Sequence, residues 1–590
     1  MTFRRRLDRI LSFGKGWQLL YLAGVALCVF ILLYLIAVVM GWGFKWQDIL
    51  GLYLDAGNFS GAGQHDWFRL IVTFSGVILV SSLLITVFNN IIDNVSQSVK
   101  AGYTRYRVRG HILIIGSGKE LFSILSALRE QGGKEEIVIL THREVEPLED
   151  SLRSAFSDPK FLSRLIFYRG ARNNYREVEA ARPQYASKIY LLGEDREKDH
   201  DSLSIECCDH LKKVCEKADK DIPCFTFLEN GSTFEVYMHD DKPLSTPRLK
   251  IDLLSSREYS AEQIIAWSWF LPLLTVNDPR TSHFIILGTG PMAKAVAFSV
   301  AHNSHYPALP DGRPRKTLIT VIGKGMREWL DNLTASREKL FSLSSYSYIS
   351  GDGTTKRHDP ERDILDIEWE FIEGCDSSPL AREYIRAAAL SHDTQSVRIA
   401  ACHSREEERI ASVLHLPREV FDKERPVPVC IYLEEGGQTI RQAIGSGNYG
   451  KIFIFGPSEG AKGDPLLEHH SARGMLINGI YAAAVRGKEN VNDFTQAWYE
   501  RSEADKFSSL YCANALVFRW ECFDTDSPDR EPLYEAEHRR WMTSKLLMGL
   551  DHSCIMPYDE LPDRKIRQHR FIIDEMLAVI KDSKEEADGK

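Results

Sequence analysis

Two long stretches without charge constrain this chain more than any other feature of its sequence. Residues 16–44 and residues 70–92 contain no Asp, Glu, Lys or Arg. A membrane-spanning helix needs about 20 apolar residues, and both stretches meet that length. No small-residue cleavage site follows the first stretch, which argues against a secretory signal. We therefore expect an integral membrane protein with two transmembrane helices.

The distribution of basic residues around these stretches predicts their orientation. Basic side chains are concentrated before the first stretch and after the second, at Arg4, Arg5, Arg6, Arg9, Lys15, Lys100, Arg105, Arg107 and Arg109. The positive-inside rule then places both the N-terminus and the C-terminus in the cytoplasm. The N-terminus lacks a transit-like composition, which favours the plasma (inner) membrane of a bacterium.

The segment between the two stretches has the composition of a re-entrant pore loop. Residues 45–63, KWQDILGLYLDAGNFSGAG, are too apolar for a solvated loop and too short for a third span. Irregular backbone at membrane depth is tolerated only where it is buried or lines water. The candidate pore and selectivity residues are Asp55, Ala56, Gly57 and Asn58. If four chains met around one axis, the Asp55 carboxylates would form a ring that attracts cations.

The second apolar stretch is more polar than a lipid-facing helix needs to be. It carries Ser, Thr and Asn side chains, and its candidate inner-helix gate residues are Gly76, Thr86, Asn89 and Asn90. Gly76 is a candidate hinge, although glycine in membrane helices also serves close packing. The alternative interpretation is that the two helices only anchor a cytosolic sensor.

The cytosolic part of the chain contains an internal repeat. Residues 111–130 and 283–302 each read as an apolar strand, a Gly-rich turn and a helix, which is how a dinucleotide-binding unit begins. Further apolar runs predict parallel α/β sheets, at residues 136–140, 164–168, 188–192, 224–228, 317–322, 396–402, 427–433 and 451–456. The candidate nucleotide-binding residues are Gly116, Ser117, Gly118, Arg143, Gly288 and Gly290.

Neither repeat has a clean acidic residue at the end of its second strand, where NAD-binding units hold the ribose. The first repeat has residues 141–143, Thr-His-Arg, at this point, and the second has Lys324. A bound nucleotide is one hypothesis, and a divalent cation at Glu194 and Asp195 is another. An NAD-dependent oxidoreductase is disfavoured, and no nucleophile and base are arranged for catalysis, so we do not expect an enzyme. The net charge of −9 argues against nucleic acid as a partner.

The sequence around the pore loop resembles the CASTOR/POLLUX family of ion channels. The resemblance covers roughly residues 45–260 and is carried by DAGN at residues 55–58, the polar second helix, RGHILIIG at 109–116 and ASKIYLLGEDREKDHDSL at 186–203. Phe59 stands where the family has a histidine. The resemblance implies a homotetramer that conducts K⁺ or Ca²⁺, with two RCK domains per chain (regulators of K⁺ conductance, TrkA-N-like) forming a gating ring.

The C-terminal part resembles the RyR domain, which is found in ryanodine receptors and, as single copies, in bacterial proteins. The residues that carry this resemblance are Glu537, His538, Trp541, Pro557, Tyr558, Glu560 and Leu561. His538, Trp541 and Lys545 also recur at helical spacing on one face. The candidate ligand residues are His538, Arg539, Trp541, Lys545 and Tyr558, whose rings and charges would hold an anionic, nucleotide-derived ligand. The other interpretation is that Trp541 is core and the basic side chains are solvated.

These features together predict a domain order. A membrane α-helical pore domain, with two transmembrane helices and a re-entrant pore loop, precedes two α/β Rossmann-like RCK domains and a small, mainly helical RyR domain. The expected boundaries are residues 1–100, 101–275, 276–489 and 490–580. The expected function is a ligand-gated cation channel. The alternative is a non-conducting, membrane-anchored nucleotide sensor that regulates a separate ion transporter.

Overall fold

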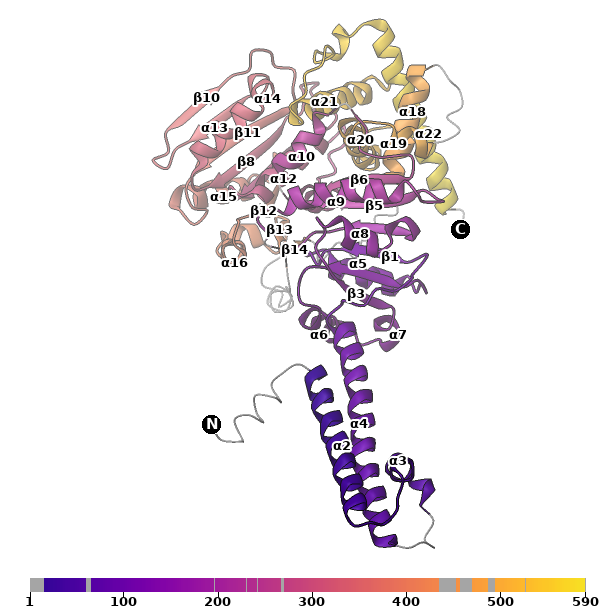
Figure 1. Cartoon of the computed structure of the whole chain (residues 1–590). Helices are drawn as coiled ribbons and strands as arrows, with labels where there is room; N and C mark the ends of the chain where they lie inside the picture. The colour runs from indigo at the N-terminus through magenta and orange to yellow at the C-terminus, as the bar shows by residue number, and fades with distance from the viewer. Residues whose placement is uncertain are drawn as a thin grey trace. The chain divides into compact units, whose positions relative to one another are not determined.

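Two compact units make up the chain, Met1–Thr104 and Arg105–Lys590. The computed structural model describes residues 15–588, apart from residues 60–64, 196, 230, 241, 267–269, 435–451, 457–469, 487–493 and 526. The first unit is a helical hairpin, and the second contains two β-sheets and a group of C-terminal helices (Figure 1).

Two long helices form most of the first unit. Helix α2 (Lys15–Val39) and helix α4 (Asp66–Lys100) lie side by side (Figure 1). Each contains a window, Leu22–Val39 and Asp66–Asn89, that is long and apolar enough to cross a membrane. Many large apolar side chains of these windows are exposed, Leu32 and Phe74 among them. Extended apolar surface of this kind is typical of contact with lipid or with another chain.

A short helix folds back against both long helices. Helix α3 (Trp46–Leu54) is followed by the 3-10 turn η1 (Ala56–Asn58). Ile49, Leu52 and Tyr53 of α3 are buried in an apolar cluster that includes side chains of both α2 and α4. An isolated helix of 9 residues is marginal in water, so this packing is what holds α3 in place.

The first sheet of the second unit is parallel throughout and buried on both faces. Its strands are β1 (Ile112–Ile115), β2 (Ile137–Thr141), β3 (Leu165–Arg169), β4 (Lys188–Leu191), β5 (Ile222–Leu228) and β6 (Leu249–Ser255). They lie in the order β3-β2-β1-β4-β5-β6, which is that of a doubly wound nucleotide-binding sheet. Separate apolar clusters cover the two faces, which is why β1 and β2 are uninterrupted apolar runs.

The second sheet repeats this topology. The strands β7 (Thr281–Leu287), β8 (Thr317–Gly323), β11 (Ile367–Glu373), β12 (Gln395–Ala401), β13 (Val429–Tyr432) and β14 (Ile452–Phe455) lie in the order β11-β8-β7-β12-β13-β14. Strand for strand, this is the order of the first sheet, so the predicted pair of parallel α/β sheets is confirmed. Beyond β11, β9 (Tyr346–Ile349) and the antiparallel β10 (Thr355–His358) extend the edge. Strands β6, β9, β10 and β11 are additions to those expected from apolar runs.

Helices connect the strands and flank both sheets. Around the first sheet they are α5 (Leu121–Glu130), α6 (Val145–Ala155), α7 (Pro159–Leu162), α8 (Tyr175–Ala180), η2 (Pro183–Tyr185), α9 (His200–Cys215), α10 (Gly231–Met238) and α11 (Ser256–Ala266). Around the second they are α12 (Pro291–Asn303), α13 (Met326–Ser336), α14 (Glu338–Ser342), α15 (Pro379–Leu390), α16 (Glu406–Leu414) and η3 (Arg418–Phe421). Helix α11 packs against α12 and so joins the two sheets.

The C-terminal helices attach to both sheets. They are α18 (His470–Arg486), α19 (Phe494–Tyr499), α20 (Glu503–Cys522), α21 (Glu531–Leu547), η5 (Tyr558–Glu560) and α22 (Asp563–Asp588). Trp498 and Tyr499 donate hydrogen bonds of 3.1 and 2.9 Å to the carboxylate of Asp252 on β6. On the other sheet, Nδ1 of His302 on α12 lies 2.8 Å from the hydroxyl of Ser544 on α21.

Two buried carboxyl groups on α11 predict a pH dependence of stability. Burial raises the pKa of Glu258 and of Glu262 to about 7. Glu262 also accepts a hydrogen bond of 3.0 Å from Asn514. An unfolded glutamate ionises at about pH 4.3, so between that pH and about 7 the folded chain binds more protons than the unfolded chain. Stability should therefore fall as the pH rises through this window.

Replacement of Glu262 by Gln should remove its share of this loss, because an amide does not ionise. From about pH 5 to about pH 8, the free energy of unfolding of Glu262→Gln should rise by up to about 3 kcal/mol relative to that of the native chain. Thermal unfolding at both pH values measures the gain. Glu407→Gln, on the exposed face of α16 (80% exposed), is the control and should show no such gain. Equal pH profiles for Glu262→Gln and the native chain would contradict the prediction.

Candidate functional site

The predicted pore residues lie in the turn that follows α3. Oδ1 of Asp55 accepts a hydrogen bond of 2.8 Å from the backbone N–H of Gly57 and so caps η1. Nδ2 of Asn58 donates to the carbonyl of Gly51 over 3.0 Å. Residues 55–58, Ala56 included, are exposed, so the turn presents carboxylate and amide oxygens at its surface. The Gly-rich end of the loop, residues 60–64, lies outside the described residues.

Tyr53 joins the short helix to both long helices. A Cβ atom on Gly76 of α4 would overlap the backbone carbonyl oxygen of Tyr53. The Tyr53 hydroxyl donates to the carbonyl of Ala26 on α2 over 2.9 Å. The structure therefore gives Gly76 a close-packing role against α3, which is the alternative that the sequence leaves open beside a hinge.

The other candidate gate residues lie in the second half of the hydrophobic part of α4. The hydroxyl of Thr86 donates to the carbonyl of Ser82 in the same helix over 2.7 Å. Asn89 is exposed, and the side chain of Asn90 lies outside the described part of the chain. An exposed amide on a membrane helix is expected to face water or another chain, because lipid offers it no hydrogen bond.

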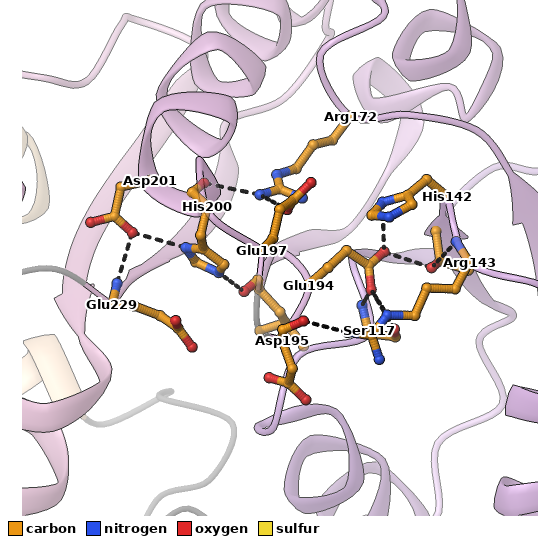
Figure 2. A network of polar contacts seen from close by, with 12 residues as sticks. Ser117, His142, Arg143, Arg172, Glu194, Asp195, Glu197, His200, Asp201 and Glu229 are labelled. Atoms are coloured by element: carbon orange, nitrogen blue, oxygen red, sulfur yellow. Dashed lines mark hydrogen bonds and ion pairs between the residues drawn. The ribbon is translucent and has the colours of Figure 1, made fainter. Parts of the chain in front are cut away.

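The Gly-rich turn of the first sheet is filled by a side chain of the protein itself. Gly116, at φ +97°, lies so close to the loop after β4 that a Cβ atom would overlap the carbonyl oxygen of Gly193. The backbone N–H of Ser117 donates to Oε2 of Glu194 over 3.0 Å, and the Thr141 hydroxyl donates to Oε1 over 2.6 Å. Figure 2 shows Glu194 directed from its loop toward Ser117 and Arg143.

Arginine and aspartate side chains complete this arrangement. Nε of Arg143 is 3.2 Å from Oε2 of Glu194, and its Nη2 donates to the backbone carbonyl of Asp195 over 2.7 Å. Oδ1 of Asp195 accepts a hydrogen bond of 2.9 Å from the backbone N–H of Lys119. Burial raises the pKa of Asp195. The loop after β4 and the Gly-rich turn therefore hold each other directly.

Further contacts hold the end of the loop after β4 and the start of α9. His200 and Asp201 interact over 2.8 Å, and Oδ1 of Asp201 accepts a 2.8 Å hydrogen bond from the backbone N–H of Glu229. Arg172 forms an ion pair of 2.7 Å with Glu197 (Figure 2). Arg172 thus holds the loop at Glu197, and Asp201 holds the start of α9 against the segment after β5.

This geometry changes two interpretations of the sequence. Ser117 and Arg143, two of the candidate nucleotide-binding residues, hold the Glu194 carboxylate in this structure, and the Glu194 side chain is 2% exposed. Glu194 and Asp195, the candidates for a divalent cation site, accept hydrogen bonds from the protein beside Arg143 in this structure. Among the described residues, no group of three or more His, Cys, Asp or Glu side chains could hold a metal ion. A nucleotide phosphate could use this turn only by displacing Glu194. Gly118 packs here as well, since its Cβ position is 3.0 Å from the carbonyl of Leu192.

The equivalent crevice of the second sheet is open. A cavity of about 270 Å³ lies at the carboxyl ends of β7, β8, β11 and β12. Cβ atoms on Gly288 and Gly290 would lie 2.8 Å from Cα of His403 and 2.5 Å from the hydroxyl of Ser404. These contacts place Ser404 at the position that Glu194 has in the first repeat, and the shorter side chain leaves space.

A carboxylate that sequence reasoning missed lies in this second crevice. Asp376 follows β11 and interacts with Nε2 of His403 over 3.2 Å and with the Ser412 hydroxyl. Burial raises the pKa of Asp376, but the hydrogen bonds from His403 and Ser412 outweigh burial and hold it well below its usual range. The crevice therefore carries its own anion, which contacts His403 and Ser412.

The C-terminal helices α18, α20, α21 and α22 surround a third site, a cavity of about 310 Å³. Three of the predicted ligand residues, His538, Trp541 and Lys545, line it from one face of α21, as their spacing predicts. The rings of Trp541 and His538 are stacked with centroids 5.8 Å apart. His552 meets the other side of this aromatic surface edge-on, 5.0 Å from Trp541.

Polar groups of this cavity are only partly paired. Lys545, 12% exposed, has an ion pair of 3.8 Å with Asp505, and burial lowers its pKa. Nδ2 of Asn478 is buried without a hydrogen-bond partner among the described residues. Nε2 of His538 donates to the carbonyl of Met556 over 2.8 Å, and burial lowers the pKa of this ring. Cation, amide and aromatic surface together suit a planar, anionic ligand.

The remaining two predicted ligand residues do not line the cavity. Arg539 turns toward Asp366, 3.4 Å from its Nε. Tyr558 lies beside His538, with ring centroids 6.0 Å apart, and its hydroxyl accepts a 3.2 Å hydrogen bond from Arg570. Sequence reasoning missed several lining residues, namely Asn478, Tyr481, Arg501, Asp505, Lys565 and His569. Each lies outside α21, so helical spacing gives no signal that connects them.

No protein-family model matches the chain, and no curated protein matches it. Among solved structures it is similar to GsuK bound to ADP, at 14% identity and a TM-score of 0.39, over 77% of this chain and 100% of that one. It is similar to the GsuK channel bound to NAD, at 12% identity and 0.41, over 79% and 86%. It is also similar to the human SLO3 gating ring, at 9% identity and 0.35, over 61% and 83%. Similarity at this level carries no information about the ion or the ligand of this chain.

Proposed function

We propose that the chain is a ligand-gated cation channel of the plasma membrane, in which four copies form the pore. The observation that carries this proposal is the packing of α3 against α2 and α4. Two helices that only anchor a sensor need no such segment, whereas a pore needs one that returns into the membrane and presents oxygens. Asp55 and Asn58 supply these oxygens directly after α3. The permeating ion is K⁺ or Ca²⁺.

In this proposal the second unit is the sensor, with the two sheets as RCK domains and the C-terminal helices as the RyR domain. The gating ligand is a nucleotide-derived anion in the cavity lined by His538, Trp541 and Lys545. Stacking on Trp541 would hold a base, and Lys545 would pair with a phosphate. The role proposed for this unit is ligand binding, with no catalytic step.

Ligand binding reaches the second sheet through α21. Ser544 precedes Lys545 and lies 2.8 Å from His302 at the end of α12. The ligand changes the gate only as far as it binds the open and closed forms unequally. A shift from mostly closed to mostly open needs a difference of about 5.5 kcal/mol in binding free energy between the two forms, and four copies would share it.

The test is current recording from purified tetramers in planar bilayers under K⁺ and Ca²⁺ gradients, with a nucleotide panel added to the side of the second unit. Asp55→Asn should lower cation conductance and reduce the preference for Ca²⁺ over K⁺, because it removes a ring of carboxylates. Asp48→Asn is the matched control, since Asp48 lies in the first turn of α3, where it accepts a hydrogen bond from the backbone N–H of Lys45, and not in the turn at residues 55–58. Identical currents in the native chain and Asp55→Asn would contradict a role in the pore.

Ligand sensing is tested in the same recordings. Lys545→Gln should weaken the response to the active nucleotide by about tenfold or more, the cost of one charged hydrogen bond, and leave permeation unchanged. Arg570→Gln, which removes a charge outside the cavity, should respond like the native chain. If well-assembled tetramers carry no current under any ligand, the anchored sensor is the better interpretation.

A further inference from the structure

A separate cavity of about 580 Å³ lies at the amino ends of β7, β12 and β13. Its walls are the segment 275–280 before β7, the segment 392–398 at the start of β12 and the segment 425–428 before β13. The open crevice of this sheet lies at the carboxyl ends of the strands, so the two cavities lie at opposite ends of the strands. Ligands of open α/β sheets usually bind at the carboxyl ends, and the cavity at the amino ends plays no part in the proposed function.

Arg398 of β12 lines this cavity, and its hydrogen bonds go to neutral groups. Its Nε donates to the carbonyl of Phe270 over 3.0 Å, and its Nη1 donates to the carbonyl of Val397 over 2.9 Å and to the Ser396 hydroxyl over 3.2 Å. Among the described residues, no carboxylate forms an ion pair with Arg398. Burial lowers the pKa of this guanidinium to about 10.

A second guanidinium lies behind the wall of the cavity. Arg315 is 2% exposed, and its Nη2 donates to the backbone carbonyls of Thr275 and Asp278, which both line the cavity. Its Nε and Nη1 are buried without a hydrogen-bond partner in the described part of the chain. Arg315 therefore adds positive charge at the amino ends of these strands, and Asp278, the carboxylate that interacts with it, is shared with Arg280.

The acidic residues of the cavity are already paired. Asp278 binds Arg280 through both carboxylate oxygens, with distances of 3.0 and 2.7 Å. Asp393 forms a 3.0 Å ion pair with Arg425, and both of these side chains are mostly exposed. The charges of Arg398 and Arg315 are left in excess. Burial of a cation without an anionic partner is unfavourable in free energy, and binding of an anion beside it offsets that unfavourable term.

We infer that this cavity binds a small oxyanion, the phosphate or carboxylate group of a metabolite, with Arg398 as its main anchor. Nε and Nη1 of Arg398 already donate within the protein, so Nη2 is the nitrogen that can donate to an oxygen of such a group. Arg280 and Arg425 flank the same space and neutralise Asp278 and Asp393, whose carboxylates would otherwise repel an anion. The volume exceeds that of a lone phosphate group, so the ligand carries its anionic group on a larger body.

Binding of inorganic phosphate and pyrophosphate to the purified full-length chain tests this inference. At low ionic strength we expect saturable binding by calorimetry and a rise of the melting temperature with probe concentration. Arg398→Gln should weaken binding by about tenfold or more, and Arg425→Gln should weaken it to a smaller extent. Arg405→Gln, at 70% exposure and outside the cavity, removes the same charge and should bind as the native chain does.

Arg425→Gln keeps the test decisive if Arg398→Gln does not fold, because the Arg425 side chain is 60% exposed. The inference is overturned if the native chain shows no saturable binding, or if the cavity variants that fold bind both probes as tightly as Arg405→Gln. It is also overturned if the probes have no effect and Arg398→Gln instead changes the oligomeric state. An acidic side chain of a second copy would then be the occupant.

Discussion

Gly76→Val is expected to abolish cation current, whereas Gly24→Val is expected to preserve it. A Cβ atom at Gly76 would overlap the carbonyl oxygen of Tyr53, so α3 must move away from α4. Overpacking of this kind costs about 1–3 kcal/mol, and the displacement acts on the turn that holds Asp55. At Gly24, on α2, an added Cβ would meet nothing within 4 Å.

Single-channel recording measures the effect, with size-exclusion chromatography as a check that both variants assemble. Tyr53→Phe provides an independent perturbation of the same contact, because it removes only the 2.9 Å hydrogen bond to Ala26. We expect it to reduce current less than Gly76→Val, since one hydrogen bond contributes about 1 kcal/mol. If Gly76→Val conducts like Gly24→Val, the packing of α3 against α4 is not required for conduction.

Glu537→Leu is expected to destabilise the C-terminal helices by about 3–5 kcal/mol, the typical cost of removing one partner of a buried ion pair. The guanidinium of Arg540 is 1% exposed and donates to Glu537 over distances of 2.7 and 3.0 Å. Without that carboxylate, a positive charge remains in an apolar interior. Hydrogen exchange of the amides in α20, α21 and α22 measures the loss locally, which suits a chain with several structural parts.

Two further variants make this measurement specific. Glu535→Leu removes a carboxylate that is 49% exposed and pairs with Arg539 at 3.7 Å, and it should change stability by less than about 1 kcal/mol. The double variant Glu537→Leu/Arg540→Met removes both charges and should recover much of the loss. Equal exchange rates in Glu537→Leu and Glu535→Leu would show that the buried pair does not stabilise these helices.

Much of the architecture could be predicted from the sequence because burial leaves a simple pattern there. Uninterrupted apolar runs identify strands such as β1, which is covered on both faces. Strand β6 was not predicted because Lys250 and Asp252 interrupt its apolar run, and the structure explains Asp252 by its bonds to Trp498 and Tyr499. Strand β11 alternates glutamate with apolar residues, which differs from the continuous apolar run typical of a strand in a parallel sheet.

The candidate sites were predicted less completely, because they depend on contacts between distant segments. The spacing of His538, Trp541 and Lys545 was sufficient to place them on one face of a helix. It could not indicate Asn478, which reaches the same cavity from α18. In the first sheet, the sequence indicates the Gly-rich turn. Only the structure shows that Glu194 accepts the hydrogen bond of the Ser117 backbone N–H.

The attachment of the C-terminal helices to both sheets has a consequence for dose–response measurements. Trp498 and Tyr499 hold β6 of the first sheet, and Ser544 holds α12 of the second. In the proposed channel, one ligand molecule bound among these helices would therefore act on both repeats of its chain in a single event. The proposed tetramer would have one such event per chain, and the Hill coefficient for this ligand should not exceed about four.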